Sequence, residues 1–183
     1  MKVVPKIHIN IGELYASKRP VIMHTTLGSC VAVCFYDYIH RIGGMNHIML
    51  PEMADFNVFN DSARYGINAM ELLINEILKL GGERENLIAK VFGGAHVLPD
   101  FSIADSIGRR NISFVKQFLE TEGIRIISQH TGGTFTRIVY FHTGTSNVLM
   151  KKLHSSFFRT MEEENRFLQQ YKTEIIKPDT TIF

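Results

Sequence analysis

The chain is poor in three features that would assign it to a common class of protein: cysteine, net charge and long apolar runs. Its 183 residues include two cysteines, and 20 basic residues nearly balance 18 acidic ones, for a net charge of +2. So small a charge does not indicate a nucleic-acid or membrane-surface partner. No apolar run approaches the roughly 18 residues that a membrane-spanning helix needs, and the N-terminus lacks the apolar segment of a signal peptide.

The two cysteines, Cys30 and Cys34, are four residues apart. If a strand runs between them, their Cα atoms are separated by roughly 13 Å, which is too far for a disulfide. Two free thiols without a cysteine-rich framework are typical of a reducing compartment. We therefore expect a cytoplasmic protein that neither inserts into a membrane nor binds nucleic acid.

The length and composition fit one domain followed by a tail. Hydrophobic residues make up 45% of the chain, enough for a core without disulfide or metal support. We expect one domain over residues 1–153 and a partly helical tail over residues 154–183. In that tail the acidic run from Glu162 to Glu164 should be on the exposed side, and the segment around Lys177–Thr181 should be loosely attached.

Hydrophobic patterning predicts two main helices among several strands. The clearest helix begins at Asp61 or Ser62 and ends at Leu80 before a glycine pair, and a second is expected over residues 111–122, with Asn111 as its N-cap. Strands are expected over residues 7–15, 21–26, 31–36, 41–50, 87–92, 124–129, 136–142 and 148–153. This pattern predicts an α+β fold, a layered α/β/α-like sandwich with a mixed or antiparallel sheet.

Cys30 is the first candidate for chemistry, because the turn at Gly28 and Ser29 delivers it to the start of a buried strand. A thiol in that place is rigidly held, while the backbone N–H groups beside it can stabilise an oxyanion. A lone buried cysteine is more often a small apolar residue of the core. Cys30 therefore needs a second residue before it predicts an active site.

His47 supplies that second residue on the following strand. A two-residue turn at Tyr38 and Ile39 would place His47 directly opposite Cys30, with Cβ atoms roughly 5 Å apart. A neighbouring imidazole activates a thiol as nucleophile and transfers protons during the reaction. The alternative is a core histidine bonded to a backbone carbonyl. Thr25 or Thr26 could orient the imidazole, as the third member of a triad does.

Other patterns give no sign of a metal or a phosphate site. The glycine pairs 43–44, 93–94 and 132–133 lack the residues of a phosphate-binding loop, so they are interpreted as turns and as walls of one site. His96, His130 and His142 do not have the spacing of a metal-ligand set. We expect no metal and no organic cofactor.

An ordered set of motifs closely resembles the CheD family of chemoreceptor glutamine deamidases. The resemblance extends from about Ile11 to Leu153, in order and at matching spacing. The segments that establish it are residues 27–34, 42–51, 64–66, 69–71, 89–95, 107–111 and 131–133, together with Arg137. Any one of these motifs is weak evidence, whereas the ordered set is specific.

The resemblance implies hydrolysis of the side-chain amide of selected glutamines in methyl-accepting chemotaxis receptors, without a cofactor. It implies Cys30 as nucleophile, His47 as base and a threonine as third member, with Ser29, Gly28, Gly93 and Gly94 around the substrate or oxyanion. The position of the family's threonine corresponds to His24 in this sequence. If the loop before Cys30 is one residue shorter here than in the family, Thr25 takes that position instead. A CheC-type phosphatase is a further partner that the resemblance implies.

Two other functions are compatible with these residues. One is a non-catalytic adaptor of the same fold that binds chemoreceptors or a phosphatase, since the shifted threonine and His130, where the family commonly has Asp, depart from the family pattern. The other is a different thiol enzyme, such as a small peptidase or a transglutaminase-like enzyme. Release of ammonia without cleavage of the backbone would separate a deamidase from a peptidase.

Overall fold

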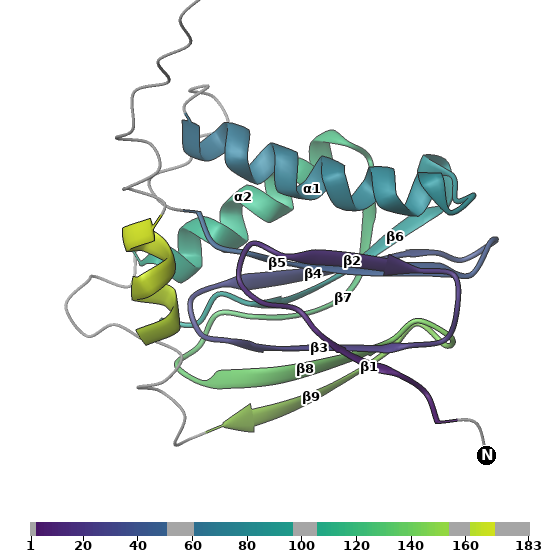
Figure 1. Cartoon of the computed structure of the whole chain (residues 1–183). Helices are drawn as coiled ribbons and strands as arrows, with labels where there is room; N and C mark the ends of the chain where they lie inside the picture. The colour runs from purple at the N-terminus through teal and green to yellow at the C-terminus, as the bar shows by residue number, and fades with distance from the viewer. Residues whose placement is uncertain (1–2, 51–60, 97–105, 154–161, 171–183) are drawn as a thin grey trace, which may run out of the picture.

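The computed structural model describes residues 3–50, 61–96, 106–153 and 162–170 (Figure 1). Its helical elements are α1 (Asp61–Lys79), the short 3-10 helix η1 (Arg84–Asn86) and α2 (Ile107–Thr121). Residues 162–170 are also helical. The strands are β1 (Lys6–His8), β2 (Leu14–Ser17), β3 (Ile22–Leu27), β4 (Val31–Asp37), β5 (Ile42–Ile48), β6 (Leu87–Gly93), β7 (Arg125–Thr131), β8 (Thr136–His142) and β9 (Asn147–Leu153). No helix among these described residues is long and apolar enough to cross a bilayer.

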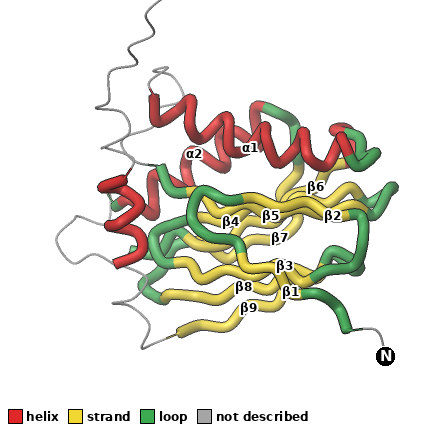
Figure 2. Tube along the Cα trace, viewed as in Figure 1, coloured by secondary structure: helices red, strands yellow, loops and turns green. Residues whose placement is uncertain are grey.

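The strands form two sheets, and α1 and α2 cover the outer face of one of them (Figures 1 and 2). One sheet has the order β2-β5-β4-β6-β7 and the other β1-β3-β8-β9. Both are mixed, because β6 pairs parallel with β7 and β1 pairs parallel with β3. The predicted α+β class, the mixed sheet and the two main helices are confirmed. The layer opposite the helices is a second sheet where helices were expected, so the layers are helix, sheet and sheet.

Strand β4 is the centre of the molecule, and all seven of its residues are buried. Residues of one parity, such as Val31 and Phe35, pack in the core beneath the helices. Residues of the other parity, such as Ala32 and Cys34, pack in the core between the two sheets, as does Cys30 directly before the strand. Burial on both faces explains the near-continuous apolar run in the sequence. It also directs the thiol of Cys30 into the layer between the sheets.

The first helix forms where its apolar periodicity predicts. Met70, Leu73, Ile74 and Ile77 are fully buried at the spacing of one helix face, and the helix ends before Gly81, whose φ is +94°. The side chains of the predicted N-caps, Asp61 and Ser62, are not among those that the structure describes.

The second helix begins four residues earlier than predicted. Its N-cap is Ser106, whose hydroxyl accepts a hydrogen bond from the Arg109 N–H, so the prediction of Asn111 as N-cap is wrong. Asn111 instead lies within the helix, and its buried side chain forms hydrogen bonds with the backbone of two loops. A residue type that suits a cap is used here to join the helix to the core.

The single strand expected over residues 7–15 is two strands, β1 and β2, which belong to different sheets. Gly12 has a φ of +82°, and this left-handed turn lets the chain pass from one sheet to the other. Of the tail, residues 162–170 form the expected helix, whereas residues 154–161 and the segment around Lys177 lie outside the described residues.

The β4–β5 hairpin has a different register from the predicted one. Asp37 pairs with Ile42, so the turn contains four residues rather than two. The Asp37 carboxylate stabilises the longer turn by accepting the N–H groups of Ile39 and His40 at 2.9 and 2.8 Å. Ala32, not Cys30, therefore lies opposite His47, and the prediction of a directly opposed pair is wrong.

Candidate active site

Cys30 and His47 lie diagonally across β4 and β5 on the face between the sheets. The register error amounts to two residues, and side chains alternate with a period of two along a strand, so both residues keep the same face. Diagonal neighbours on one face remain within reach when one of them is a long side chain such as an imidazole. The two residues are fully or almost fully buried, with 0% and 4% of their surfaces exposed.

The loop that carries Cys30 is held by the end of β6. The Cys30 carbonyl accepts a hydrogen bond from the Gly94 N–H at 2.7 Å, and the Gly28 carbonyl accepts one from the Ala95 N–H at 2.8 Å. A Cβ atom on Gly93, whose φ is +110°, would lie 2.2 Å from the Cys30 carbonyl oxygen. Gly28, Gly93 and Gly94, which the sequence predicted around the substrate or oxyanion, thus shape and fix the loop through close backbone contacts.

Asn111 holds this loop directly, and Arg137 holds the end of β6 to which the loop is bonded. Asn111 donates to the Ser29 carbonyl at 2.9 Å and accepts the Leu50 N–H at 2.9 Å. Arg137 is buried and donates to the Gly93 carbonyl at 2.7 Å and to the Gly132 carbonyl at 2.5 Å. Asn111 thus fixes the Ser29 carbonyl of the loop, and Arg137 fixes the neighbouring carbonyls of Gly93 and Gly132. The N–H groups of Ser29 and Cys30 remain for other acceptors.

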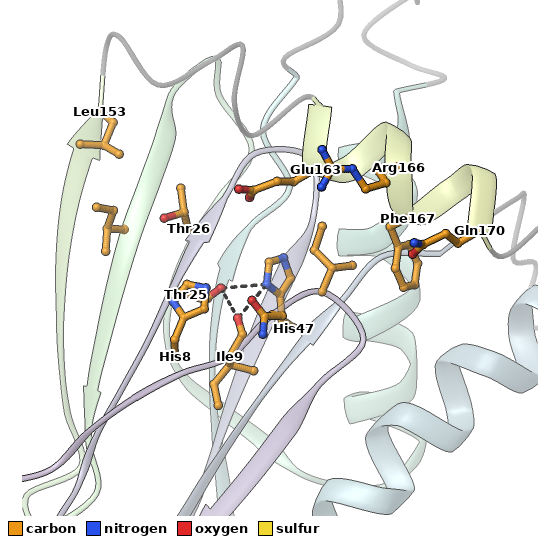
Figure 3. A pocket seen from close by; sticks show the side chains of 13 residues that line it. His8, Ile9, Thr25, Thr26, His47, Leu153, Glu163, Arg166, Phe167 and Gln170 are labelled. Atoms are coloured by element: carbon orange, nitrogen blue, oxygen red, sulfur yellow. Dashed lines mark hydrogen bonds between the residues drawn. The ribbon is translucent and has the colours of Figure 1, made fainter.

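The imidazole of His47 is bonded at one nitrogen to Thr25 and Ile9 (Figure 3). Its Nδ1 atom lies 2.8 Å from the Thr25 hydroxyl oxygen and 3.3 Å from the Ile9 carbonyl oxygen. The Thr25 hydroxyl itself donates to the Ile9 carbonyl at 2.7 Å. The carbonyl can only accept, and the Thr25 hydroxyl donates to that carbonyl, so this network assigns the proton of the neutral ring to Nδ1. The Nε2 atom then holds the free lone pair, and it is buried without a hydrogen-bond partner in the described part of the chain.

The backbone of His47 is held by the segment between β1 and β2. The His47 carbonyl accepts the Gly12 N–H at 2.8 Å, and its N–H donates to the Glu13 carbonyl at 3.0 Å. This segment also supplies the Ile9 carbonyl, so one stretch of chain positions both the backbone and the ring. Side chains alternate between the two faces of β3, so Thr25 and Thr26 point in opposite directions. The hydroxyl that is hydrogen-bonded to Nδ1 is that of Thr25.

The chain is similar along most of its length to proteins named as glutamine deamidases. The model of the CheD family, described as CheD chemotactic sensory transduction, matches residues 49–152. A probable chemoreceptor glutamine deamidase CheD of Methylobacillus flagellatus is 42% identical over 176 residues, which cover 94% of this chain and 86% of that protein. The chain belongs to the CheD family.

Two further relatives agree with this assignment. The probable chemoreceptor glutamine deamidase CheD of Herminiimonas arsenicoxydans is 43% identical over 94% of this chain and 86% of its own length. The protein named CheD 1 of Shewanella oneidensis is 44% identical over 85% of this chain and 77% of its own length. The resemblance that the ordered motifs predicted is confirmed, and the relatives' matches extend beyond the segment that the family model covers.

The N–H groups beside Cys30 are occupied by a side chain of the C-terminal helix, residues 162–170. One oxygen of the Glu164 carboxylate accepts the Ser29 N–H at 2.8 Å and the Cys30 N–H at 3.3 Å. The other oxygen accepts the Ser29 hydroxyl at 2.5 Å. Glu164 is 3% exposed, so the prediction that the whole acidic run faces solvent is wrong. The prediction considered only that all three residues are acidic. In the helix, successive side chains point in different directions, and Glu164 points inward.

A cavity of about 450 Å³ lies beside His47 (Figure 3). One wall is formed by β3 and the segment after β1, including Thr25, Thr26 and Ile9, and the facing wall by the C-terminal helix, including Arg166 and Phe167. The cavity places open space next to the imidazole, on the side from which the helix approaches.

Burial changes the protonation of both central residues. It lowers the pKa of His47 to about 4, so the ring is neutral near pH 7 and able to accept a proton. Burial raises the pKa of the Cys30 thiol well above its ordinary value, and the negative charge of Glu164 raises it further. With Glu164 in this position, Cys30 is held as a thiol.

The lowered pKa of His47 predicts a pH dependence of folding stability. Between about pH 4 and 6.5 the unfolded chain binds a proton at this residue and the folded chain does not, so stability rises with pH in this window. From about pH 8 to about pH 5, the free energy of unfolding should fall by about 2 kcal/mol more in the wild type than in His47→Gln. Urea unfolding of both proteins at both pH values measures this. Equal falls in the two proteins would show that the ring is not buried as described.

Four groups in this site were not predicted from sequence: the Ile9 carbonyl, the amide of Asn111, the Arg137 guanidinium as support for the loop, and Glu164. Asn111 and Arg137 belong to the ordered motifs, so the sequence held a signal for them without their roles. His130, the departure from the family pattern, contacts Arg137 through its carbonyl oxygen at 3.0 Å. The backbone of Ile9 had no signal, because any residue supplies a carbonyl.

Proposed function

We propose that this chain hydrolyses the side-chain amide of selected glutamines in methyl-accepting chemotaxis receptors, using Cys30 as nucleophile and His47 as base. The names of the relatives support the reaction and the substrate class. The observation that supports the residue roles most strongly is the bonding of His47, whose Nδ1 proton is held by Thr25 and Ile9. That bonding leaves a basic Nε2 on the face of the sheet that also holds Cys30.

The first half of the reaction forms a thioester. His47 Nε2 takes the thiol proton of Cys30, and the sulfur attacks the Cδ carbonyl of the glutamine side chain, forming a C–S bond. The carbonyl oxygen becomes an oxyanion while the C–N bond is still intact. His47 then returns its proton to the nitrogen, the C–N bond breaks, and ammonia leaves. Thr25 keeps the ring oriented and stabilises the imidazolium through Nδ1.

The second half releases the product. A water molecule gives a proton to His47 Nε2 and attacks the thioester carbon. The C–S bond then breaks, the proton returns to the sulfur, and the side chain leaves as a carboxylic acid, which loses its remaining proton to solvent to give glutamate. Water replaces the amide nitrogen in the net reaction, and His47 transfers the protons of both bond-breaking steps. No step requires a metal or an organic cofactor.

The N–H groups of Ser29 and Cys30 are the proposed oxyanion donors. They converge on a single oxygen, that of Glu164, at 2.8 and 3.3 Å, which is the arrangement that an oxyanion hole requires. The carbonyl oxygen of a substrate glutamine would occupy the same point. Gly28, Gly93 and Gly94 contribute by holding these donors in place.

Thr25 is proposed as a positioning residue, and a pair of variants tests this. Thr25→Ala removes the hydroxyl from Nδ1 and should lower kcat on the order of 10²-fold, less than the loss of a full triad carboxylate, because the Ile9 carbonyl still accepts from Nδ1. Thr26→Ala should stay close to wild type, and Thr25→Ser should recover most of the activity because it keeps the hydroxyl. A kinetic series on one receptor fragment measures all three. A failure of Thr25→Ser to recover activity would indicate a packing role.

The proposed function is tested with the cytoplasmic fragment of a methyl-accepting receptor. Incubation with the purified chain should release ammonia and convert particular glutamines to glutamates, located by peptide mass spectrometry. The intact receptor backbone separates this reaction from peptidase activity. Incorporation of a primary amine in place of water would indicate a transglutaminase-like enzyme. Since the substrate region of such a receptor is cytoplasmic, the proposal also places this chain in the cytoplasm.

An adaptor without catalytic activity is the second candidate, and one observation favours it. Cys30 is fully buried, with a carboxylate hydrogen-bonded beside it, and such a thiol is unreactive. Suppose that the wild type and variants with Glu164 replaced bind a receptor fragment or a CheC-type phosphatase but release no ammonia. That result would support the adaptor. Ammonia release from any of these proteins would exclude it.

A further inference from the structure

The C-terminal helix presents to Cys30 the chemical group that deamidation produces, a glutamate side chain. Its carboxylate is bound by the Ser29 N–H, the Cys30 N–H and the Ser29 hydroxyl. Every contact comes from the loop of the proposed nucleophile. These partners are buried backbone N–H groups and a buried hydroxyl, so the contact is not a surface ion pair.

The helix is seated by one apolar face that follows Glu164. Phe167 and Leu168 are three and four residues further along, so they share the face of Glu164, and both pack against the core between the sheets. The Phe167 ring lies near Tyr65, with ring centroids 6.3 Å apart. The neighbouring acidic residues, Glu162 and Glu163, are exposed. The helix therefore docks in the manner of an amphipathic helix in a groove, with one polar anchor.

The positions of the two carboxylate oxygens match the two groups of a glutamine amide. Glu164 Oε1 lies where the donors of Ser29 and Cys30 converge, the point proposed for the substrate carbonyl oxygen. Glu164 Oε2 lies beside the Ser29 hydroxyl, where the amide nitrogen would be before it leaves.

We infer that residues 162–170 bind the catalytic site in cis as a product-like ligand, with Glu164 in the place of the glutamate that deamidation leaves. This inference rests on the proposed function. The site is then a binding site for a glutamate or glutamine side chain displayed on a helix, and the chain's own tail competes with the substrate for it. Burial of Cys30 and the charge of Glu164 both act against formation of the thiolate.

The sharpest test converts the tail from a product into a substrate. In Glu164→Gln the amide should occupy the site of the carboxylate, and Cys30 should hydrolyse it, so that the purified variant regenerates Glu164 without any receptor. Tethering gives the tail a high effective concentration, so conversion should approach completion. Tandem mass spectrometry of the tryptic peptide containing residue 164 locates the change and separates it from deamidation of Asn165.

Two matched controls accompany this variant. Glu162→Gln places a glutamine on the exposed side of the same helix, and it should remain a glutamine although Cys30 is intact. The double variant Cys30→Ala with Glu164→Gln should keep its glutamine, which excludes spontaneous hydrolysis. Conversion at position 162 equal to that at 164 would overturn the inference, since it would show that the tail is not seated in one register.

A second measurement examines competition with substrate. Glu164→Ala removes the anchor and should raise kcat/KM on a receptor fragment on the order of tenfold, as expected if the site is free for about one tenth of the time in the wild type. Alkylation of Cys30 by iodoacetamide should accelerate by a similar factor. Glu162→Ala should change neither rate, because its side chain is exposed.

The outcomes separate this inference from the proposed function. If receptor fragments are deamidated but the glutamine of the Glu164→Gln variant persists and Glu164→Ala changes no rate, the tail does not occupy the site. The inference then fails while the function stands. If no variant deamidates either the receptor or its own tail, the proposed function fails and the inference fails with it. Self-conversion at position 164 that requires Cys30 supports both.

Discussion

Replacing Cys30 by alanine should abolish glutamine deamidation while leaving the fold intact. The nucleophile forms the bond to substrate, and loss of such a residue lowers kcat on the order of 10⁶-fold, below detection in an ammonia-release assay. The lost sulfur is small, so the cost in folding stability should be about 1 kcal/mol. Circular dichroism and urea unfolding would verify the fold, and peptide mass spectrometry of a receptor fragment would measure the activity.

Cys34 provides a matched control for that variant. It lies on β4, the strand that Cys30 directly precedes, and it is also buried in the core between the sheets. Burial also raises the pKa of its thiol, and the charge that acts on it is that of Lys90 rather than Glu164. Cys34→Ala should therefore lose similar stability and keep its activity. Residual turnover in Cys30→Ala, or a complete loss in Cys34→Ala, would show that the nucleophile has been misassigned.

Gly93→Ala should cause the largest loss of stability that a single added methyl group can produce here. The new Cβ atom would lie 2.2 Å from the Cys30 carbonyl oxygen and 3.1 Å from the Val31 Cα, and both are backbone atoms that cannot rotate away. Its φ of +110° also strains any residue with a side chain. The free energy of unfolding should fall by about 3–5 kcal/mol. Activity should fall as well, since relief of the clash moves the loop that carries Cys30.

Gly123→Ala separates the effect of the steric clash from the effect of the positive φ. Gly123 has a φ of +67°, and a Cβ atom there would meet nothing within 4 Å. This variant should lose only the cost of the left-handed conformation, roughly 1–2 kcal/mol, and should keep its activity. Urea unfolding of both variants beside the wild type gives the comparison. Equal losses would mean that the backbone around Cys30 yields easily and that Gly93 does not fix this loop.

The site could be predicted from sequence where its parts are local. Gly28, Ser29 and Cys30 form a turn that enters a buried strand, and the alternation along two neighbouring strands places His47 on the same face as Cys30. That result survived an error of two residues in register, because a shift by an even number preserves the face. The turn itself was missed because the Asp37 carboxylate accepts backbone N–H groups there, a choice that no hydrophobic pattern records.

Local pattern by itself determined most of the strands, the main helix and the face shared by Cys30 and His47, since periodicity is a property of neighbouring residues. The order of motifs determined the family. The tertiary structure decided that a second sheet covers the face opposite the helices and that the Ile9 carbonyl and the Thr25 hydroxyl together position one ring nitrogen. It also decided that Glu164 lies against a loop 134 residues earlier in the chain. Contacts between segments so far apart depend on how the whole chain packs, and no local periodicity encodes them.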